Sequence, residues 1–197
     1  DRLQDKAQSF LEKHFTSSVL PLLSPQIIGR KQPFPFLRNK AIYAVAILKT
    51  KNGGERMGIV PCGEGVLRRL VPLPGEGQRF MLVEELIVSF LPKIFAHYKV
   101  EGAVLIRLVR SADIHVDDAS SEMGGMLAEE YRRSMEKMIR RRKRLQPVKL
   151  DYQGKLTDSV RDSLCSCLGL SKKHLFSSGA PLDLTFMGAL RDMLRDK

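Results

Sequence analysis

The sequence has few cysteines, and its histidines are not spaced to hold a metal. Its three cysteines, an odd number, do not form the paired framework of small secreted proteins. Two of them, Cys165 and Cys167, are two positions apart and would point to different faces of a helix. The four histidines are scattered and fit no zinc-ligand spacing: His14, His97, His115 and His174. We therefore expect reduced cysteines in the core and no metal site.

No apolar run reaches the ~18–20 residues that a helix needs to cross a bilayer. The longest candidate, residues 80–95, is interrupted by two glutamates, a proline and a lysine. The chain starts at Asp1, with neither an initiator methionine nor a signal pattern. Its 197 residues can bury an ordinary core. These features predict a cytoplasmic piece of a longer protein, without a membrane span.

The sequence also lacks the signatures of common catalytic sites. It has no glycine-rich loop of the G-x-x-x-x-G-K-[ST] type and no spacing that favours a nucleophile with its base. Gly124 and Gly125 fit no phosphate-binding loop. We therefore expect no catalytic residue, bound metal or cofactor in this chain.

Positive charge is abundant and concentrated in one window. The formal net charge is +11, and residues 132–149 contain nine basic side chains and one acid, Glu136. Such a field attracts polyanions, including nucleic acid, polyphosphate and acidic membrane surfaces. The charge alone does not choose between them.

The first half of the sequence predicts a helix followed by a β-hairpin. Apolar residues recur at helical spacing over residues 3–15, and prolines then break the chain over 21–35. Two β-branched runs, 41–48 and 55–60, flank Asn52-Gly53, a pair that favours tight hairpin turns. Glycines and prolines follow as far as Gly77, which suggests a subdomain boundary near residue 75. Residues 1–75 would then be a helix plus a hairpin, and 76–197 an α/β sandwich, all within one domain of 1–197.

The second half alternates strands and helices in the order β-α-β-β-α-β. The expected elements are strand 80–83, helix 84–95, strand 100–109, strand 114–116, helix 119–144 and strand 148–152. A helix over 157–168 ended by Gly169, a strand near 174–177 and a helix from Leu182 complete the chain. This ferredoxin-like order predicts an α+β fold, a two-layer sandwich of a mainly antiparallel sheet with helices on one face.

Six segments, in order along the chain, resemble the middle domain of bacterial polyphosphate kinase. They are 15–25 with Gln32-Pro-Phe-Pro-Phe-Leu-Arg-Asn39, Leu70-Val-Pro-Leu-Pro74, Arg79-Phe80 with Glu84-Glu85, Arg107-Leu-Val-Arg110-Ser-Ala-Asp113, Asp117-Asp118 with the basic helix and Val148-Lys-Leu150, and Gly179-Ala-Pro-Leu-Asp-Leu184. Gln32 and Arg38 stand where the family usually has His and Ser, and Ala180 is inserted. Each motif is weak alone, but their order and spacing are specific.

The resemblance implies a function for a parent enzyme rather than for this chain. Members of the family make inorganic polyphosphate reversibly from ATP through a phosphohistidine. Two phospholipase-D-like domains that follow the middle domain carry the catalytic histidine, the ATP site and the magnesium site. None of their motifs occurs in this sequence. The resemblance thus implies a non-catalytic domain for subunit contact and positioning of the catalytic core. The parent would be a cytoplasmic homo-oligomer that can associate with the membrane.

The most basic run, Arg140, Arg141, Arg142, Lys143 and Arg144, has two interpretations. Guanidinium groups bind phosphate oxygens in bidentate pairs, which favours a polyphosphate or other polyanion contact. Cations at the end of a helix also complement its negative dipole and keep it soluble. The second interpretation carries more weight, because the run covers all faces of a helix.

Two family motifs are expected to be structural. Arg107 and Arg110 are three positions apart on a strand and would point to opposite faces, so one pocket cannot use both. One of them is expected to pair with Asp113 or Glu101. In Pro33-Phe34-Pro35-Phe36, the two rings are expected to fill the core, with docking on a neighbouring domain as the alternative.

A free-standing basic module that binds nucleic acid is the alternative function. The ferredoxin-like order and the positive charge favour it. RNA-recognition domains, however, carry aromatic side chains on their central strands, and residues 100–109 contain none.

Overall fold

A six-stranded sheet with the strand order β1-β3-β2-β6-β7-β8 forms the centre of the fold. The computed structural model describes residues 2–29, 33–51, 53–63, 67–75, 78–111 and 145–195. All neighbouring strands pair antiparallel except β7 and β8, which pair parallel. The strands are β1 (Gln26–Ile28), β2 (Ile42–Lys49), β3 (Glu55–Pro61), β6 (Lys99–Arg110), β7 (Pro147–Gly154) and β8 (Leu175–Ser177). The predicted α+β class with a mainly antiparallel sheet is confirmed.

Strand β2 lies in the middle of this sheet because nearly all of its side chains are apolar. Ala44, Ala46 and Leu48 contribute to one apolar cluster, while Tyr43 and Val45 contribute to another. Successive side chains of a strand point to opposite faces, so the two clusters lie on the two faces of the sheet. The sheet is therefore buried on both sides around β2.

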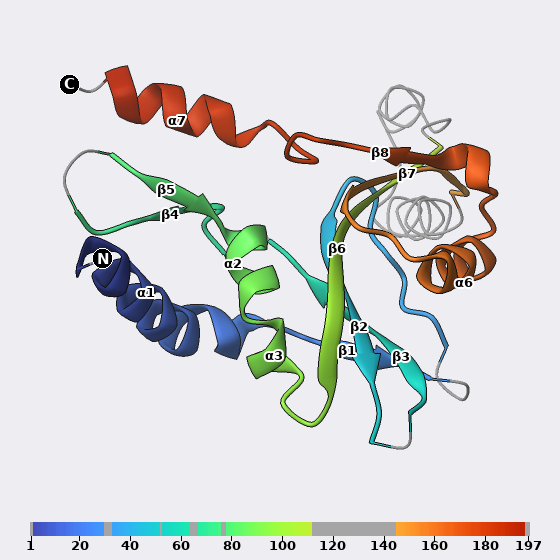
Figure 1. Cartoon of the computed structure of the whole chain (residues 1–197). Coiled ribbons are helices and arrows are strands. Elements are labelled where there is room, and N and C mark those ends of the chain that lie inside the picture. Colours follow the sequence, from blue (N-terminus) through green and yellow to red (C-terminus); the bar gives the residue numbers. More distant parts are fainter. Residues whose placement is uncertain are drawn as a thin grey trace, which may run out of the picture.

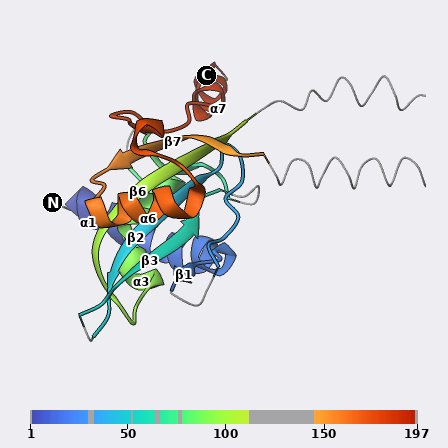
Figure 2. The ribbon, with the colours of Figure 1, turned by 90° about the vertical axis from the view of Figure 1, so that its right-hand side faces the viewer.

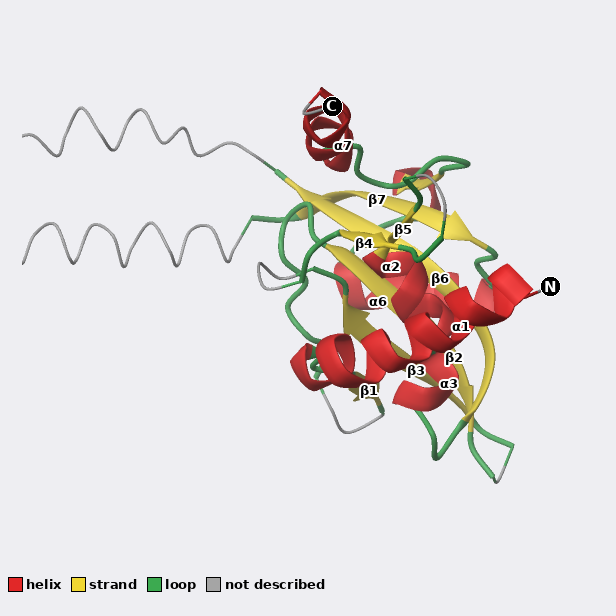
Figure 3. Cartoon of the chain, turned by 90° about the vertical axis from the view of Figure 1, so that its left-hand side faces the viewer, coloured by secondary structure: helices red, strands yellow, loops and turns green. Residues whose placement is uncertain are grey.

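Helices cover both faces of the sheet (Figures 2 and 3). The first cluster includes side chains of α2 (Val83–Ser89), α3 (Leu91–Ile94) and the π-helical turn Phe15–Val19 that continues α1 (Arg2–His14). The second includes Val160, Leu164 and Leu168 of α6 (Asp158–Leu168). The prediction of helices on one face is thus wrong. The apolar side of α6 packs on the second face of the sheet, where β2 also has apolar side chains.

The ferredoxin-like order is not confirmed. Strand β5 (Phe80–Leu82) pairs with β4 (Leu70–Pro72) in a separate two-stranded sheet, rather than joining β6 (Figure 1). The predicted strand 114–116 and the predicted helix 119–144 lie outside the described residues. The subdomain boundary near residue 75 stays a prediction, but β2 and β6, from its two sides, pair over the whole length of β2.

Local sequence signals account for the ends of the helices. Thr157 caps α6 by accepting a hydrogen bond from the Val160 N–H, and Gly169 ends it at φ 66°, as predicted. The predicted helix 84–95 is divided at Phe90, because Pro92 has no N–H to donate and its ring would clash with the preceding turn. The last helix, α7 (Phe186–Arg195), begins four residues after the predicted Leu182.

The cysteines differ in their surroundings. Cys62 is buried, and this burial raises the pKa of its thiol far above the ordinary value. Cys165 is half-buried and Cys167 is exposed, so the expectation of core thiols holds for Cys62 alone. All three are free. No described helix is both long enough and apolar enough to span a bilayer.

Candidate functional site

Arg110, at the end of β6, joins three parts of the chain. It is 8% exposed, and its Nε donates to the Leu37 carbonyl at 3.0 Å. Its Nη1 donates to the Leu145 carbonyl at 2.7 Å, just before β7. The backbone N–H of Arg110 donates to Asn39 Oδ1 at 2.9 Å. Burial lowers the pKa of the guanidinium, and the hydrogen bonds to carbonyl oxygens compensate its lost hydration.

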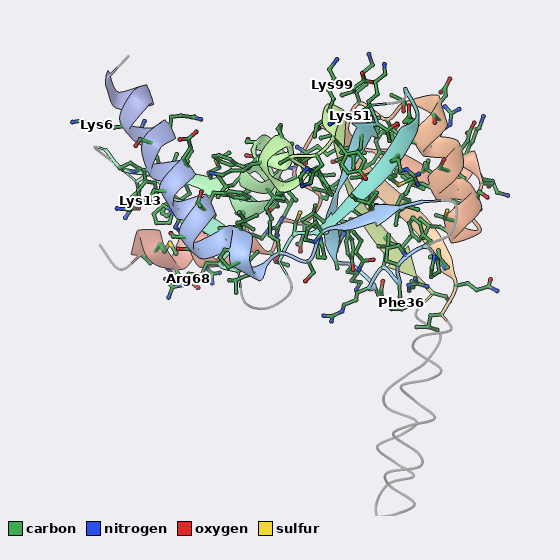
Figure 4. All side chains as sticks on the ribbon, turned by 90° about the horizontal axis from the view of Figure 1, so that it is seen from below. Lys6, Lys13, Phe36, Lys51, Arg68 and Lys99 are labelled. Carbon is green, nitrogen blue, oxygen red and sulfur yellow. The ribbon has the colours of Figure 1, made fainter. Side chains whose placement is uncertain are left out.

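Phe36 covers the open side of this guanidinium. The Arg110 Cζ lies 4.3 Å from the centroid of the Phe36 ring, a cation–π contact. The Phe36 side chain is 52% exposed, and Figure 4 shows it at the edge of the domain, away from α1. The prediction of a core position is therefore wrong for Phe36, because its ring lies at the surface, stacked on the Arg110 guanidinium. Phe34 is half-buried against the α6 cluster, while Pro33 is exposed and Pro35 half-buried.

Arg107 makes a contact of a different kind. Its Nε donates to the Lys40 carbonyl at 3.2 Å, and in the sheet it lies opposite Ile42 on one side and Asp151 on the other. The two arginines thus bind different carbonyls. Glu101, one expected partner, instead pairs with Lys49 at 3.3 Å. The other, Asp113, lies outside the described residues, as do Arg140, Arg141, Arg142, Lys143 and Arg144.

A second arginine centre, which no sequence pattern predicted, surrounds Arg69. Its Nε and Nη2 bind Oε1 of Glu84 at 3.1 and 2.7 Å. Glu84 is 2% exposed and the Arg69 side chain 21%, so the ion pair is largely buried, and two guanidinium donors converge on one carboxylate oxygen. The same Nη2 donates to the Asp183 carbonyl at 2.6 Å, and Nη1 lies 3.3 Å from Asp183 Oδ2. Arg69 Nη1 also lies 3.3 Å from Thr185 Oγ1.

Three elements hold the Arg69 centre in place. Arg69 directly precedes β4, and its carbonyl accepts the Val83 N–H at 2.9 Å. Glu84 is in the first turn of α2, and Asp183 lies before α7. The Phe186 ring, in the first turn of α7, lies 5.2 Å from Arg69 Cζ. One side chain therefore ties β4, α2 and the start of α7 together.

The electrostatics of Asp183 follow from the same geometry. Burial raises the pKa of its carboxyl, but hydrogen bonds from Thr185 and the charges of Arg69 and Arg107 lower it more, so that it lies below its ordinary value. The signal that could have revealed this centre is Glu84. It is an acid within an apolar helix face, and such a residue needs a cationic partner.

A cleft of about 540 Å³ lies between α6 and the β2–β3 hairpin. Its polar lining includes Thr50, Glu55, Arg56, Ser159 and Ser163. Ser159 donates to Glu55 Oε1 at 2.8 Å across it. In the described part of the chain, no group of three His, Cys, Asp or Glu side chains is placed to hold a metal ion. The lining of the cleft thus has polar character.

Comparisons with known proteins agree on one family. The sequence model of the polyphosphate kinase middle domain matches residues 6–190. A polyphosphate kinase of Halalkalibacterium halodurans is 34% identical over 98% of this chain and 27% of its own length. One of Lactiplantibacillus plantarum is 28% identical over 95% of this chain and 25% of its own length. The crystal structure of polyphosphate kinase from Porphyromonas gingivalis has a similar fold, with a TM-score of 0.63 and 19% identity over 88% of this chain and 24% of that one. The chain thus spans about a quarter of the length of these relatives.

Proposed function

Because this chain belongs to the polyphosphate kinase family, as its middle domain, we propose that it is a non-catalytic domain that positions the catalytic core of such an enzyme. The enzyme would transfer the terminal phosphate of ATP reversibly to inorganic polyphosphate. ATP and magnesium would bind to other parts of the polypeptide, and this domain would also contribute to contacts between subunits.

The observation that carries this proposal is how the residues in and beside the family motifs are used. Arg110 and Arg69 direct their guanidinium groups to carbonyl oxygens and to a buried carboxylate within the domain. Donors that are already engaged in this way are not free to bind a substrate. Their role is to fix the relative positions of distant segments, which is what a positioning domain needs.

The length of the relatives also supports the proposal. They are about four times as long as this chain, so most of each relative lies outside the matched segment. A domain that links such parts needs to be rigid and to hold its connecting segments in a defined direction. The sheet buried on both faces supplies the first, and the anchored start of α7 supplies the second.

A labelling experiment tests the catalytic half of the proposal. The 197-residue chain is incubated with magnesium, polyphosphate and ATP labelled in its γ-phosphate, and the products are separated by length. We expect no elongation of polyphosphate and no acid-labile label on protein. Acid-labile label on any of the four histidines would contradict the proposal.

The positioning half is tested in a full-length polypeptide that carries this segment. Arg110→Ala is expected to lower kcat by roughly tenfold or more, because misplacement of a distant catalytic group by about 1 Å is costly. The KM for ATP should change little, since Arg110 does not contact it in this proposal. Lys51→Ala, at the exposed hairpin, is the matched control (Figure 4). Equal kcat values for the Arg110 variant and the control would reject a positioning role.

A further inference from the structure

Helix α7 presents apolar side chains to solvent. Met187 is 51% exposed and Met193 43% exposed, and Leu184, just before the helix, is 57% exposed. Leu190 is half-buried. Residues three or four positions apart share a helix face, so Met187, Leu190 and Met193 form an apolar side. Charged side chains of Arg191, Asp192 and Arg195 accompany them.

This helix is outside the apolar core of the domain. Within the described residues, neither apolar cluster includes a side chain of α7. Figure 1 shows α7 at the end of the molecule near β4 and β5, far from α6. Its start is nevertheless fixed, because Arg69 binds Asp183, contacts Thr185 and stacks on Phe186. The start of α7 is thus held in a defined direction, while Met187 and Met193 remain exposed among the described residues.

Most of a full-length relative lies outside this chain. The chain spans 27% and 25% of the lengths of two polyphosphate kinases that it matches over 98% and 95% of its own length. A full-length protein therefore has much further surface on which the exposed side of α7 can pack.

We propose that α7 is a junction helix, whose apolar side packs into an apolar surface of the polypeptide that adjoins the middle domain in a full-length polyphosphate kinase. This inference rests on the proposed function. Its partner is a covalently linked apolar surface rather than a free protein, a nucleic acid or a membrane. Methionine suits such a surface, because its flexible side chain adapts to irregular gaps.

The size of the helix argues against a second copy of the chain as the partner. Ten residues of helix are about 15 Å long, so one side offers roughly 150–300 Å². Two copies would then bury together well under the ~1,000 Å² that a stable interface between separate proteins needs. A covalent connection removes this requirement, because it gives the two surfaces a high effective concentration.

Methionine oxidation tests the inference without measuring activity. Dilute hydrogen peroxide is applied to the 197-residue chain and to a full-length polypeptide that carries it, and mass spectrometry follows each methionine. In the isolated chain, Met187 and Met193 are expected to oxidise at least about tenfold faster than Met57, which is 8% exposed. In the full-length protein, both should be protected by about tenfold or more, while Met57 stays unchanged.

Two results would overturn the inference. One is equal oxidation of Met187 and Met193 in the two proteins. The other is protection in the isolated chain that grows with its concentration, which would identify a second copy as the partner. Met187 and Met193 could also be protected from oxidation in a full-length protein that makes no polyphosphate. That result would reject the proposed function but support the inference about α7.

A pair of variants adds a control. Met187→Gln with Met193→Gln removes apolar character at similar length, and Leu22→Gln does the same at a 50% exposed site elsewhere. In the isolated chain, neither should change the unfolding midpoint in urea. In the full-length protein, only the methionine pair should accelerate proteolysis at the end of α7. Equal proteolysis of both variants would also overturn the inference.

Discussion

At the scale of single residues, two arginines organise the domain by the same means. A guanidinium has five N–H donors in a planar fork, so it can bind several oxygens at once. Arg110 binds two carbonyls and stacks on Phe36, and Arg69 binds Glu84 and the segment at Asp183. A lysine has the charge but not the fork, so it cannot make all of these contacts at once.

Replacement of Arg69 is expected to destabilise the domain strongly. Arg69→Ala leaves the Glu84 carboxylate buried without its partner, which costs roughly 3–5 kcal/mol of unfolding free energy. Arg69→Lys should cost less, because it retains the charge. Urea unfolding followed by circular dichroism measures the effect. Arg191→Ala removes an exposed arginine paired with Asp192 and should stay within about 0.5 kcal/mol. A loss as small for Arg69→Ala would mean that the buried pair contributes nothing.

Asp183 gives the Arg69 centre a dependence on pH. Its pKa is lower in the folded protein than its ordinary value of 3.8, so its contribution to stability is present above that value and is lost as the pH falls through the folded pKa. Asp183→Asn removes the charge at every pH. The wild type should therefore exceed this variant in stability at pH 6, and the difference should shrink towards pH 3. Urea midpoints across this range measure it, and a constant difference would contradict the assignment.

The sequence indicated the Arg110 centre more clearly than the Arg69 centre. Arg110 lies in a motif of charged residues within an apolar strand, which marks it as a residue that needs partners. Arg69 lies in a loop among ordinary surface arginines, and its partner Asp183 is 114 positions away. No periodicity or spacing reports such a distant contact. Glu84 carried the only local signal, because burial of an acid requires a cation.

At the scale of elements, glycine has opposite effects in a strand and in a helix. A Cβ on Gly58 of β3 would lie 2.5 Å from the ring of Phe95, so the absence of a side chain lets this ring pack on the sheet. A Cβ on Gly188 of α7 would meet nothing within 4 Å. The first glycine is required by packing, and the second only weakens its helix.

This contrast predicts opposite results for two alanine substitutions. Gly58→Ala should lower the unfolding free energy by about 1–3 kcal/mol, because the Phe95 ring must move. Gly188→Ala should raise the stability of α7 by about 0.5–1 kcal/mol, through helix propensity alone. Urea unfolding checks the first, and amide hydrogen exchange in α7 checks the second. Stabilisation by Gly58→Ala would show that the ring has room to shift.

The elements were predictable where a local signal decides them. The hairpin strands, α6 with Thr157 and Gly169 at its ends, and the long strand β6 follow from periodicity and caps. The partners of strands were not predictable in this way. Phe80–Leu82 has the composition of a strand in any sheet, and its pairing with Leu70–Pro72 depends on where the chain between them turns. In the same way, the order of elements does not specify which face of the sheet α6 covers.

At the scale of the whole molecule, the basic window predicts weak binding of polyanions. Polyphosphate bound at Arg140–Arg144 would release counterions, so its affinity should fall steeply as salt rises. Arg141→Gln, Arg142→Gln and Arg144→Gln together should weaken binding and reduce this salt dependence, with little change in stability. Titration of labelled polyphosphate at several salt concentrations measures both. Equal affinities and equal salt dependences for the two proteins would show that these arginines do not bind polyphosphate.

The same titration separates the two classes of function. A single-stranded RNA of matched charge is the competitor. A positioning domain of a polyphosphate kinase should bind both polymers weakly and without preference, since only the charge density attracts them. Preference for particular RNA sequences would instead favour the nucleic-acid module, because sequence is read by contacts to bases.

The Arg69 centre also sets an order of assembly during synthesis. Glu84 follows Arg69 by 15 positions, whereas Asp183 follows it by 114. At ~5–20 residues per second, a ribosome needs roughly 5–20 s to make the stretch between Glu84 and Asp183. By then all six strands of the central sheet have been synthesised, so the ion pair can form early and must wait for its last ligands. The direction of α7 can consequently be fixed only after every strand of the central sheet has been synthesised.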